Sequence, residues 1–540
     1  MALPIIATAC ISVSDDGQVG ATPAPEVTAA APAGSPTIAP LASIAPTPTP
    51  EPTPATVEAE VLGFIPGWLL EQAAPAIDRD LLTVAAIHSV EASGNGRLVS
   101  KKPSGDVPPG WKALESDAFA ELKDELQAEG IKVVPVIQRA GWTEGTAERT
   151  ATLLSKKKNR RALADRIARF VDERGFDGVN LDFEPVPARL ADEFVSLVRD
   201  VRAALDGIEP GLHLSVDVLP GLDGYDLASL VAEDAADLAV IMGYNYRTDR
   251  AAVAGSTAPL MDPSGVDLAG SVAAAIEQIE PGQVMLALPW YGKAWATETD
   301  RAGSQTVGGK GIDAPSDPHY AVAVEFATRS GRNYEPAQAS AWTAYPEQQC
   351  PSCPAVWRQV WYDDPDSFGA KVDHALEQGL AGVGVWALGM ENGREELWQA
   401  LRHKLRPSND AVAPGGNATL DPEQLRGDLE GRDVVEGVAP LRLFADDDAG
   451  GSGLMLVRIG LDGELDGDGR LVTGRSYPAT ASTDVEFPLG DESTGGATEP
   501  GPRDIHVQWR DIAGNWSEPL VIEAWVLDPL TSPTPEDLAA

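Results

Sequence analysis

Short apolar runs alternate with amphipathic stretches between residues 58 and 405. Helical patterns separate most of the runs, at 118–130, 159–175, 189–205, 271–280 and 366–379. The runs themselves read as strands of β-branched and aromatic residues, at 61–68, 81–90, 131–138, 178–184, 212–220, 238–246, 284–292 and 382–389. Strands separated by helices pair in parallel, so eight of them predict an α/β fold with a closed (β/α)8 TIM barrel. The alternative is an open doubly wound sheet, although no Gly-rich phosphate loop occurs.

The pattern changes after the predicted barrel. Residues 406–434 are rich in Pro, Gly and Asp and predict a linker, and residues 435–528 show short alternating runs between turn clusters. Those runs predict an all-β sandwich domain. Its D-I-A-G-N-W-S stretch, 511–517, resembles the immunoglobulin- or fibronectin-like modules attached to bacterial surface enzymes. Residues 529–540 predict a disordered tail.

The N-terminal segments point to export. Residues 18–57 are Pro-, Ala- and Thr-rich and cannot bury a core, so they predict a disordered, extended linker. Residues 1–17 predict a truncated lipoprotein or secretion signal, because A-T-A-C resembles the site before a lipid-modified cysteine, here Cys10. The alternative is an apolar terminus without a signal function. No Lys or Arg stands at the start, which a misplaced start codon would explain. We therefore expect a secreted or cell-surface protein, with a candidate lipid anchor at Cys10.

Charge and composition narrow the partners. The 540 residues carry a net charge of −41, spread along the chain, which repels nucleic acid and anionic lipid. No window reaches the roughly 18 apolar residues of a transmembrane span. Cys350 and Cys353 lack a second pair and the six histidines lack ligand spacing, so we expect no metal, no cofactor, and either a local disulfide or two free thiols. We also expect a monomer.

The most informative segment is Asp177-Gly178-Val179-Asn180-Leu181-Asp182-Phe183-Glu184. Its alternation predicts a strand with an apolar face and a face that carries Asn180, Asp182 and Glu184. Crowded carboxyl groups cannot all ionise, so one of them holds a proton at neutral pH. A protonated carboxyl beside an ionised one is suited to cleaving a glycosidic bond. The alternative is an antiparallel strand with a solvated acidic face.

The barrel prediction distinguishes between these interpretations. Active sites of such barrels lie at the carboxyl ends of the strands. Asp182 and Glu184 end the fourth strand, Tyr244 and Asn245 end the sixth, and Trp386 ends the eighth. We expect these side chains to meet at one rim, which a solvated acidic strand would not predict.

Residues 58–405 resemble glycoside hydrolase family 18, the chitinase-like enzymes. The family signature D-x-x-D-x-D-x-E matches Asp177, Asn180, Asp182 and Glu184, and the segments VLGFIPGW, IMGYN, LPWYGKAW and GVGVWALG match other strands. The resemblance implies a retaining glycosidase whose substrate provides the nucleophile, its own 2-acetamido carbonyl. The implied substrate is therefore an N-acetylglucosamine-containing polysaccharide, with no metal or nucleotide.

The resemblance also implies residue roles. Glu184 would be the general acid and then the base, Asp182 would orient the acetamide, and Tyr244 would donate a hydrogen bond to it. Trp386 would form the floor beneath the sugar. We expect Asp177 to hold the strand-end loop rather than to act in catalysis.

Two positions depart from the family pattern, because Asn180 and Asn245 replace aspartates. We expect each change to remove a buried charge near Asp182. Asn180 resembles the branch acting on peptidoglycan and spore cortex, and VVPVIQRAGW lacks the S-x-G-G of typical chitinases. The substrate is therefore open between chitin oligosaccharides and the peptidoglycan glycan strand.

Several aromatic residues could line a sugar groove or belong to the core. Trp68 and Trp290 stand at strand ends and are the better groove candidates, and Met242 joins them from the sixth-strand motif. Two competing functions remain open: a non-hydrolytic lectin on the same barrel, and an endo-β-N-acetylglucosaminidase acting on protein-linked glycans. Lectins of this type usually lack the acid, whereas Glu184 is present.

Overall fold

The computed structural model describes residues 58–526, apart from 349, 351, 408, 426–433, 436 and 497–500. The predicted signal at 1–17, the linker at 18–57 and the tail at 529–540 lie outside the described residues.

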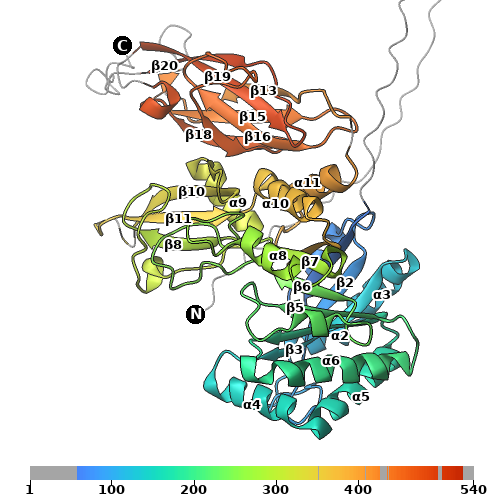
Figure 1. Ribbon diagram of the computed structural model, residues 1–540. Helices are drawn as coiled ribbons and strands as arrows, with labels where there is room; N and C mark the ends of the chain where they lie inside the picture. The colour runs from blue at the N-terminus through green and yellow to red at the C-terminus, as the bar shows by residue number, and fades with distance from the viewer. Residues whose placement is uncertain are drawn as a thin grey trace, which may run out of the picture. The chain divides into compact units, whose positions relative to one another are not determined.

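Eight parallel strands close into a barrel, in the order β1-β12-β7-β6-β5-β4-β3-β2 (Figure 1). The strands are β1 (Glu60–Pro66), β2 (Val84–Glu91), β3 (Lys132–Ala140), β4 (Gly178–Glu184), β5 (His213–Val218), β6 (Leu238–Met242), β7 (Val284–Pro289) and β12 (Gly382–Trp386). Each of them falls within or overlaps a predicted strand, and the predicted (β/α)8 barrel is confirmed. The open doubly wound sheet is excluded, because β1 pairs with both β2 and β12.

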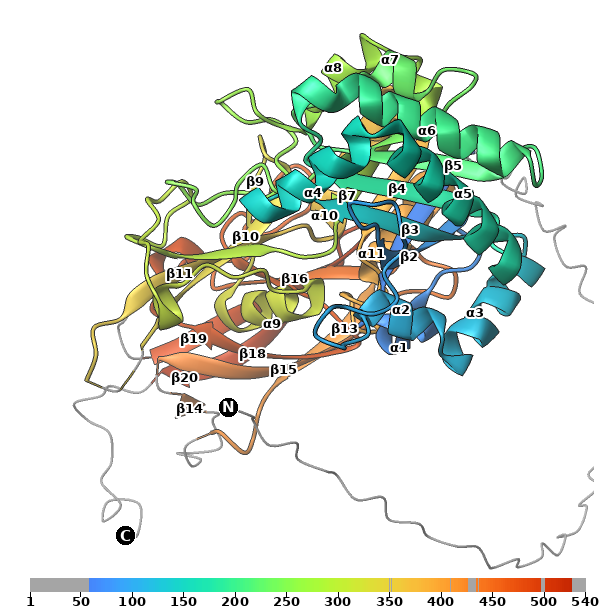
Figure 2. The same ribbon diagram turned by 90° about the horizontal axis from the view of Figure 1, so that it is seen from below.

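Helices cover the outside of the barrel, and Figure 2 shows α4, α5 and α6 beside β3, β4 and β5. The helices are α1 (Leu70–Ala73), α2 (Pro109–Leu114), α3 (Asp117–Ala128), α4 (Glu144–Ser155), α5 (Lys157–Arg174), α6 (Ala191–Asp206), α7 (Leu227–Leu230), α8 (Leu268–Ile276), α10 (Pro365–Glu377) and α11 (Glu396–Leu405). Helix α6 shows why they form: Phe194, Val198, Val201 and Leu205 recur at helical spacing and are fully buried. None of the described helices combines the length and apolar character that crossing a membrane requires.

An insertion between β7 and β12 forms a separate antiparallel sheet, which the sequence analysis did not predict. Its order is β8-β11-β10-β9, and α9 (Tyr320–Ser330) lies beside β10 and β11 (Figure 1). The strands are β8 (Lys293–Thr297), β9 (Asn333–Glu335), β10 (Ser340–Glu347) and β11 (Val356–Tyr362). Trp342 and Trp361 stack across β10 and β11 with ring centroids 5.3 Å apart. Cys350 and Cys353, between these strands, form a disulfide.

The region after α11 is all-β and consists of two sheets. One contains β13 (Gly415–Leu420), β15 (Val438–Asp446) and β18 (Ser482–Pro488), and the other contains β14 (Val434–Val435), β20 (Leu520–Val526), β19 (Gly501–Asp511), β16 (Leu454–Gly460) and β17 (Arg475–Pro478). Leu443 and Phe487 of the first share one hydrophobic cluster with Val457 and Trp509 of the second. The predicted linker at 406–434 was wrong in part, because β13 lies within it and pairs with β15. The resemblance of this all-β region to immunoglobulin- or fibronectin-like modules stays a prediction.

Candidate active site

Strand β4 carries its polar residues on the face that points into the barrel. The opposite face packs against the helices, with the Phe183 ring 5.3 Å from that of Phe194 on α6. Side chains two apart share a face, so Asn180, Asp182 and Glu184 point inward together. Both neighbours of β4 are parallel to it, and Asn180 and Asp182 are buried. These observations exclude a solvated antiparallel strand.

Asp182 is held by residues of β3, which is next to β4, and of β2, which is next to β3. Gln138 lies opposite Asp182 in the register of β3, and its Nε2 donates a 2.9 Å hydrogen bond to Asp182 Oδ2. The His88 Nε2 atom lies 3.6 Å from the same oxygen and 3.1 Å from Gln138 Nε2. Asp182 Oδ1 is buried and has no hydrogen-bond partner among the described residues. One oxygen is thus fixed, and the other is free to accept a hydrogen bond from a bound molecule.

A second buried carboxyl group reaches this cluster from β5. Asn180 Nδ2 donates to Asp217 Oδ1 over 2.8 Å and to Ser215 Oγ over 3.0 Å. Burial raises the pKa of Asp217 well above its ordinary value, and the charge of Asp182 raises it further. Burial therefore favours the protonated form of Asp217, and the hydrogen bond from Asn180 opposes this shift. Although Asn180 replaces an aspartate of the family motif, a carboxyl group remains within hydrogen-bond distance of that position.

Glu184 lies at the carboxyl end of β4, where it is partly buried. Burial raises its pKa to about 8, and the nearby charge of Asp182 acts in the same direction. A hydrogen bond from Trp142 opposes this shift. The Trp142 side chain, in the loop after β3, is 61% exposed. At pH 7 Glu184 is therefore mostly protonated and can act as an acid at a position that solvent reaches.

Tyr244 follows the end of β6 and is buried, as is Met242 two residues before it. Burial raises the pKa of the Tyr244 phenol well above its ordinary value, and the charges of Glu184 and Asp182 contribute. The phenol therefore keeps its proton and remains a hydrogen-bond donor. Its ring centroid lies 6.0 Å from that of Tyr291, edge to face.

Four rings follow one another beside Asp182, in the order Phe64, Trp386, His88 and Trp68. Trp386 ends β12, and its ring centroid lies 4.7 Å from that of His88 and 5.6 Å from that of Phe64. Trp68 lies 6.0 Å from His88 on the other side and is 52% exposed. The structure thus brings Trp386 and Trp68 together around His88, which itself contacts Asp182.

Trp290 was wrongly predicted as a groove residue. Its indole is fully buried and packs edge to face against Trp398 at 5.0 Å and Phe368 at 6.1 Å. Its backbone N–H donates to the Trp386 carbonyl over 2.7 Å, so the two tryptophans are neighbours along the barrel. Trp290, however, points into the helix layer of α10 and α11, so it belongs to the core.

The expectation for Asn245 was also wrong. Its side chain is exposed, and its backbone has a φ of 61°, a left-handed conformation in which Asn is enriched. Its Oδ1 accepts a 2.9 Å hydrogen bond from the Tyr291 hydroxyl. An aspartate here would be solvated, so Asn245 removes no buried charge.

Asp177 precedes β4, at the opposite end of the strand from Glu184. Its Oδ2 accepts hydrogen bonds from the Val133 backbone N–H at 2.7 Å and from Gln127 Nε2 at 2.8 Å. These contacts hold the amino ends of β3 and β4 together. The structure therefore separates Asp177 from the other three motif residues.

Three residues of the site were absent from the predicted set: His88, Gln138 and Asp217. Each had a signal in the sequence, because it is a polar residue within a predicted strand. The register that places them beside Asp182 had none. Trp142 was one of the tryptophans that could line a sugar groove.

A group of three carboxylates spaced closely enough to hold a metal ion lies far from these residues in the sequence. Asp410, Asp447 and Asp448 each offer a carboxylate oxygen within 4.8 Å of the others, the one such group among the described residues. Two of the carboxylates already accept backbone N–H groups, Asp410 from Ser452 and Asp447 from Gly453. The cluster around Asp182 contains no such group.

A closed (β/α)8 barrel with converging acids at the carboxyl ends of its strands is the architecture of a barrel enzyme active site. The chain belongs to family 18 of the glycosyl hydrolases, whose family model matches residues 60–391.

The proteins similar to this chain include a glycosylase, a chitinase and an agglutinin. YdhD of Bacillus subtilis, named as a sporulation-specific glycosylase, is 24% identical over 322 residues, 58% of this chain and 69% of YdhD. A Cycas revoluta chitinase solved with (GlcNAc)4 superposes with a TM-score of 0.53 and 22% identity, over 64% of this chain and 99% of that one. A chitinase-like agglutinin from Robinia pseudoacacia has the same TM-score and coverage at 20% identity. At these identities the two structures show the shared fold.

Proposed function

We propose that the protein hydrolyses β-1,4-linked N-acetylglucosamine polymers with retention of anomeric configuration. The observation that carries the proposal is the pairing on β4: Glu184, whose pKa burial raises to about 8, stands beside the buried Asp182. A protonated acid next to a fixed carboxylate is what glycosidic cleavage requires.

The chemistry begins with protonation of the bridging oxygen by Glu184 as the bond to the leaving sugar breaks. The acetamido carbonyl oxygen of the substrate attacks the anomeric carbon from the opposite face and forms a cyclic oxazolinium ion. Glu184, now ionised, takes a proton from water, which opens the ring. The two inversions give net retention.

Asp182 and Tyr244 would position the acetamide. Asp182 Oδ1 lacks a partner among the described residues, so it can accept the amide N–H and stabilise the positive ring. Gln138 fixes the other oxygen and thereby the orientation of the carboxylate. Tyr244, protonated because it is buried, donates to the carbonyl oxygen.

The aromatic row supports a sugar subsite at the same rim. Trp386 lies edge to face with His88, and His88 lies 3.6 Å from the Asp182 carboxylate. A pyranose on the Trp386 ring would therefore carry its acetamide close to Asp182. The exposed Trp68 offers a further surface for the polymer.

Chitin oligosaccharides and the peptidoglycan glycan strand are both candidate substrates. The likeness to a chitinase that binds (GlcNAc)4 supports the first. The likeness to a protein named as a sporulation-specific glycosylase, with Asn180 in the motif, supports the second. Both polymers present the acetamide that the mechanism needs.

The test is to incubate the protein and its Glu184→Gln variant with chitin oligomers and with purified peptidoglycan, and to identify products by mass spectrometry. Glu173→Gln, at an exposed position of α5, is the matched control. We expect wild-type and control proteins to release products and Glu184→Gln to lose at least about a hundredfold in rate. Inverted products, read by NMR, would exclude the acetamide route.

The same variant separates the other candidate functions. A lectin, such as the agglutinin that shares the fold, would bind sugar equally with Glu or Gln at position 184 and release nothing. An endoglycosidase would release glycans from a glycoprotein in preference to cutting chitin oligomers.

We also propose that the protein acts outside the cell. The Cys350–Cys353 disulfide and the Pro-, Ala- and Thr-rich stretch at 18–57 support this location. Protease treatment of intact producing cells should remove the protein, and a Cys10→Ala variant should lose any lipid label. Protection from protease in intact cells would contradict the proposal.

A further inference from the structure

A second hollow lies where the insertion meets the all-β region, and it shares no lining residue with the site on β4. It has a volume of about 770 Å³ and is lined by β9, β10 and β11 together with β16 and β17. The backbone N–H of Arg332 donates to the Ser476 carbonyl over 2.7 Å, and the Arg475 guanidinium donates to the Ser330 carbonyl. These bonds join the two walls.

Positive charge gathers in this hollow. Its lining includes Arg332, Arg458, Arg470 and Arg475, against the two acids Asp300 and Asp491. The whole chain has twice as many acidic as basic residues and a net charge of −41. The hollow therefore reverses the sign of its surroundings, which favours an anionic ligand.

Arg458 forms no ion pair within the described part of the chain, and the carboxylate that acts on its charge, Asp466, is paired with Arg470 at 3.0 Å. Its guanidinium donates to the carbonyls of Leu471 at 2.8 Å and Val472 at 3.1 Å, and to Ser476 Oγ at 3.3 Å. All three acceptors are neutral. Burial lowers its pKa, the neighbouring charge of Arg470 lowers it further, and the charge of Asp466 opposes the shift. A half-buried cation with only neutral partners is costly unless an anion binds there.

Arg475, like Arg458, has no carboxylate partner within hydrogen-bond distance among the described residues. The closest carboxylate oxygen in its ion pairs belongs to Asp491, at 3.9 Å, which is too long for a hydrogen bond. Arg332, in contrast, is fully engaged by Asp364 and Asp366 at 2.8 and 3.0 Å. Arg470 is paired with Asp466 at 3.0 Å. Arg458 and Arg475 are therefore the two groups available to a ligand.

Aromatic side chains form the opposite wall. Trp357 on β11 and Tyr345 on β10 are half-buried and line the hollow. Tyr345 stacks on Phe326 of α9 with centroids 4.9 Å apart, which covers one of its faces and leaves the other. Aromatic faces beside polar groups suit the apolar faces of sugar rings.

We propose that this hollow binds an anionic saccharide, with the sugar ring against Trp357 and Tyr345 and its carboxylate or phosphate group on Arg458 and Arg475. A neutral sugar would leave the two guanidinium groups unpaired, and an inorganic anion would leave the aromatic wall uncovered. The proposal is independent of hydrolysis on β4.

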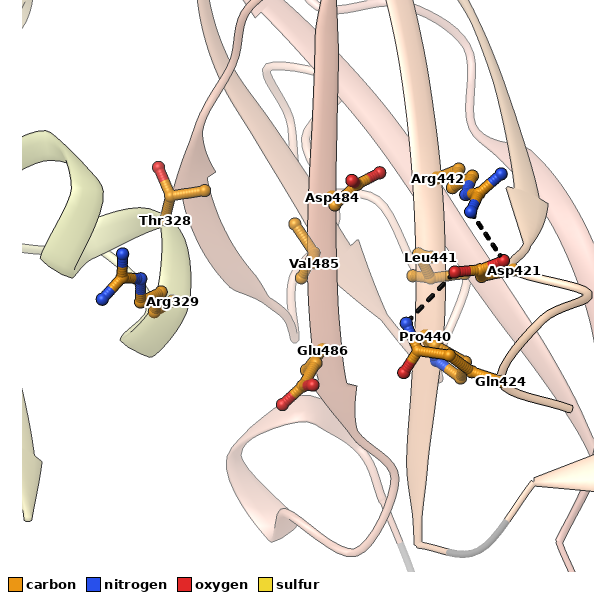
Figure 3. Close-up of a pocket in the computed structure, with 10 residues that line it drawn as sticks. All are labelled: Thr328, Arg329, Asp421, Gln424, Pro440, Leu441, Arg442, Asp484, Val485 and Glu486. Carbon is orange, nitrogen blue, oxygen red and sulfur yellow. Dashed lines mark hydrogen bonds and ion pairs between the residues drawn. The ribbon is translucent and has the colours of Figure 1, made fainter. Parts of the chain in front are cut away.

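A neighbouring hollow shows the contrast (Figure 3). Arg329 of α9 lies across it from β18, and Arg442 forms a 3.0 Å ion pair with Asp421. Asp484 and Glu486 also line it, and its lining contains no aromatic residue. Its three acids outnumber its two arginines, so the hollow does not favour an anion and Arg329 provides a control position.

The experiment uses the full chain carrying Glu184→Gln, with glucuronate, glucose 6-phosphate and glucose as probes. The three sugars differ only in the group at carbon 6, and none carries the acetamide that the β4 site requires. Affinity is measured by ligand-observed NMR. We expect glucuronate or glucose 6-phosphate to bind at least about tenfold more tightly than glucose, because charge-assisted hydrogen bonds are the stronger ones. Which of the two binds identifies the anionic group.

Variants locate the binding. Arg458→Gln/Arg475→Gln should reduce the affinity for the anionic sugar to that for glucose, Trp357→Ala should weaken binding, and Arg329→Gln should change nothing. If the double variant melts at a much lower temperature, Arg475→Gln and Trp357→Ala decide alone. Equal binding of the three sugars, or an unchanged affinity in the Arg variants, would overturn the proposal and leave the hydrolase assignment untouched.

Discussion

Asn180 donates a 2.8 Å hydrogen bond from its side-chain amide to the carboxyl group of Asp217. The two residues lie on adjacent strands, and the register sets Asp217 directly opposite Asp182. Asp182 thus faces a carboxyl group whose pKa is raised well above its ordinary value by burial and by the charge of Asp182, and the neutral Asn180 amide binds that group. Asn180 thus supplies a hydrogen bond to Asp217 without adding a second charge at position 180.

Replacement of Asn180 by Asp should make stability strongly dependent on pH. The new carboxyl would face Asp217 in a buried site, so its folded pKa would lie above the unfolded value. Stability gained from such a group is present below the unfolded pKa, near 4, and is lost as pH rises through the folded pKa. We expect the melting temperature of Asn180→Asp to fall relative to wild type between pH 5 and 8. Asn180→Ala, which adds no titratable group, should show a smaller dependence on pH than Asn180→Asp.

The pKa of Glu184 should set the alkaline limit of activity. A general acid works only when protonated, so kcat/KM should be half-maximal at about pH 8, the pKa that burial gives Glu184. The hydrogen bond from Trp142 lowers that pKa. Trp142→Phe removes the donor, so the alkaline limb should move to higher pH. A limb that stays in place or moves to lower pH would contradict the assigned contact.

Two Gln–Asp pairs at opposite ends of β4 should have different effects. Gln138 donates to Asp182 at 2.9 Å, and Gln127 donates to Asp177 at 2.8 Å. A hydrogen bond to a charged group is worth about 1.5–3 kcal/mol. Gln138→Ala should therefore lower kcat about ten- to hundredfold, because Asp182 would lose its orientation. Gln127→Ala should cost about 1.5–3 kcal/mol of unfolding free energy and leave kcat unchanged. Equal kinetic effects would refute the separation of Asp177 from catalysis.

Trp290 and Trp386 should respond in opposite ways to truncation. Trp290 is fully buried among Trp398 and Phe368, so Trp290→Ala should destabilise the fold by about 3–5 kcal/mol. Trp386→Ala should leave unfolding, measured by denaturant titration, much less affected and raise KM for chitin oligomers, because it removes the sugar floor. A Trp290→Phe variant, which keeps the core filled, should bind substrate as wild type does.

The local sequence determined the barrel and the acid face. In β4, Val179, Leu181 and Phe183 alternate with Asn180, Asp182 and Glu184, and a strand has only two faces, so the alternation alone separates core from site. The same reasoning located all eight barrel strands. It missed β13, whose G-G-N-A-T-L run reads as linker, because pairing with β15 supplies the order that the residues lack by themselves.

Tertiary structure decided which residues join the acids. Gln138 and Asp217 reach Asp182 only through the registers of β3 and β5 against β4, and His88 only through its place on β2. Trp290 and Trp386 look alike in sequence, each at the end of a predicted strand, yet one points toward the helices and the other toward His88. Alternation along a strand is a local property, whereas register and facing direction depend on contacts between segments far apart in the chain.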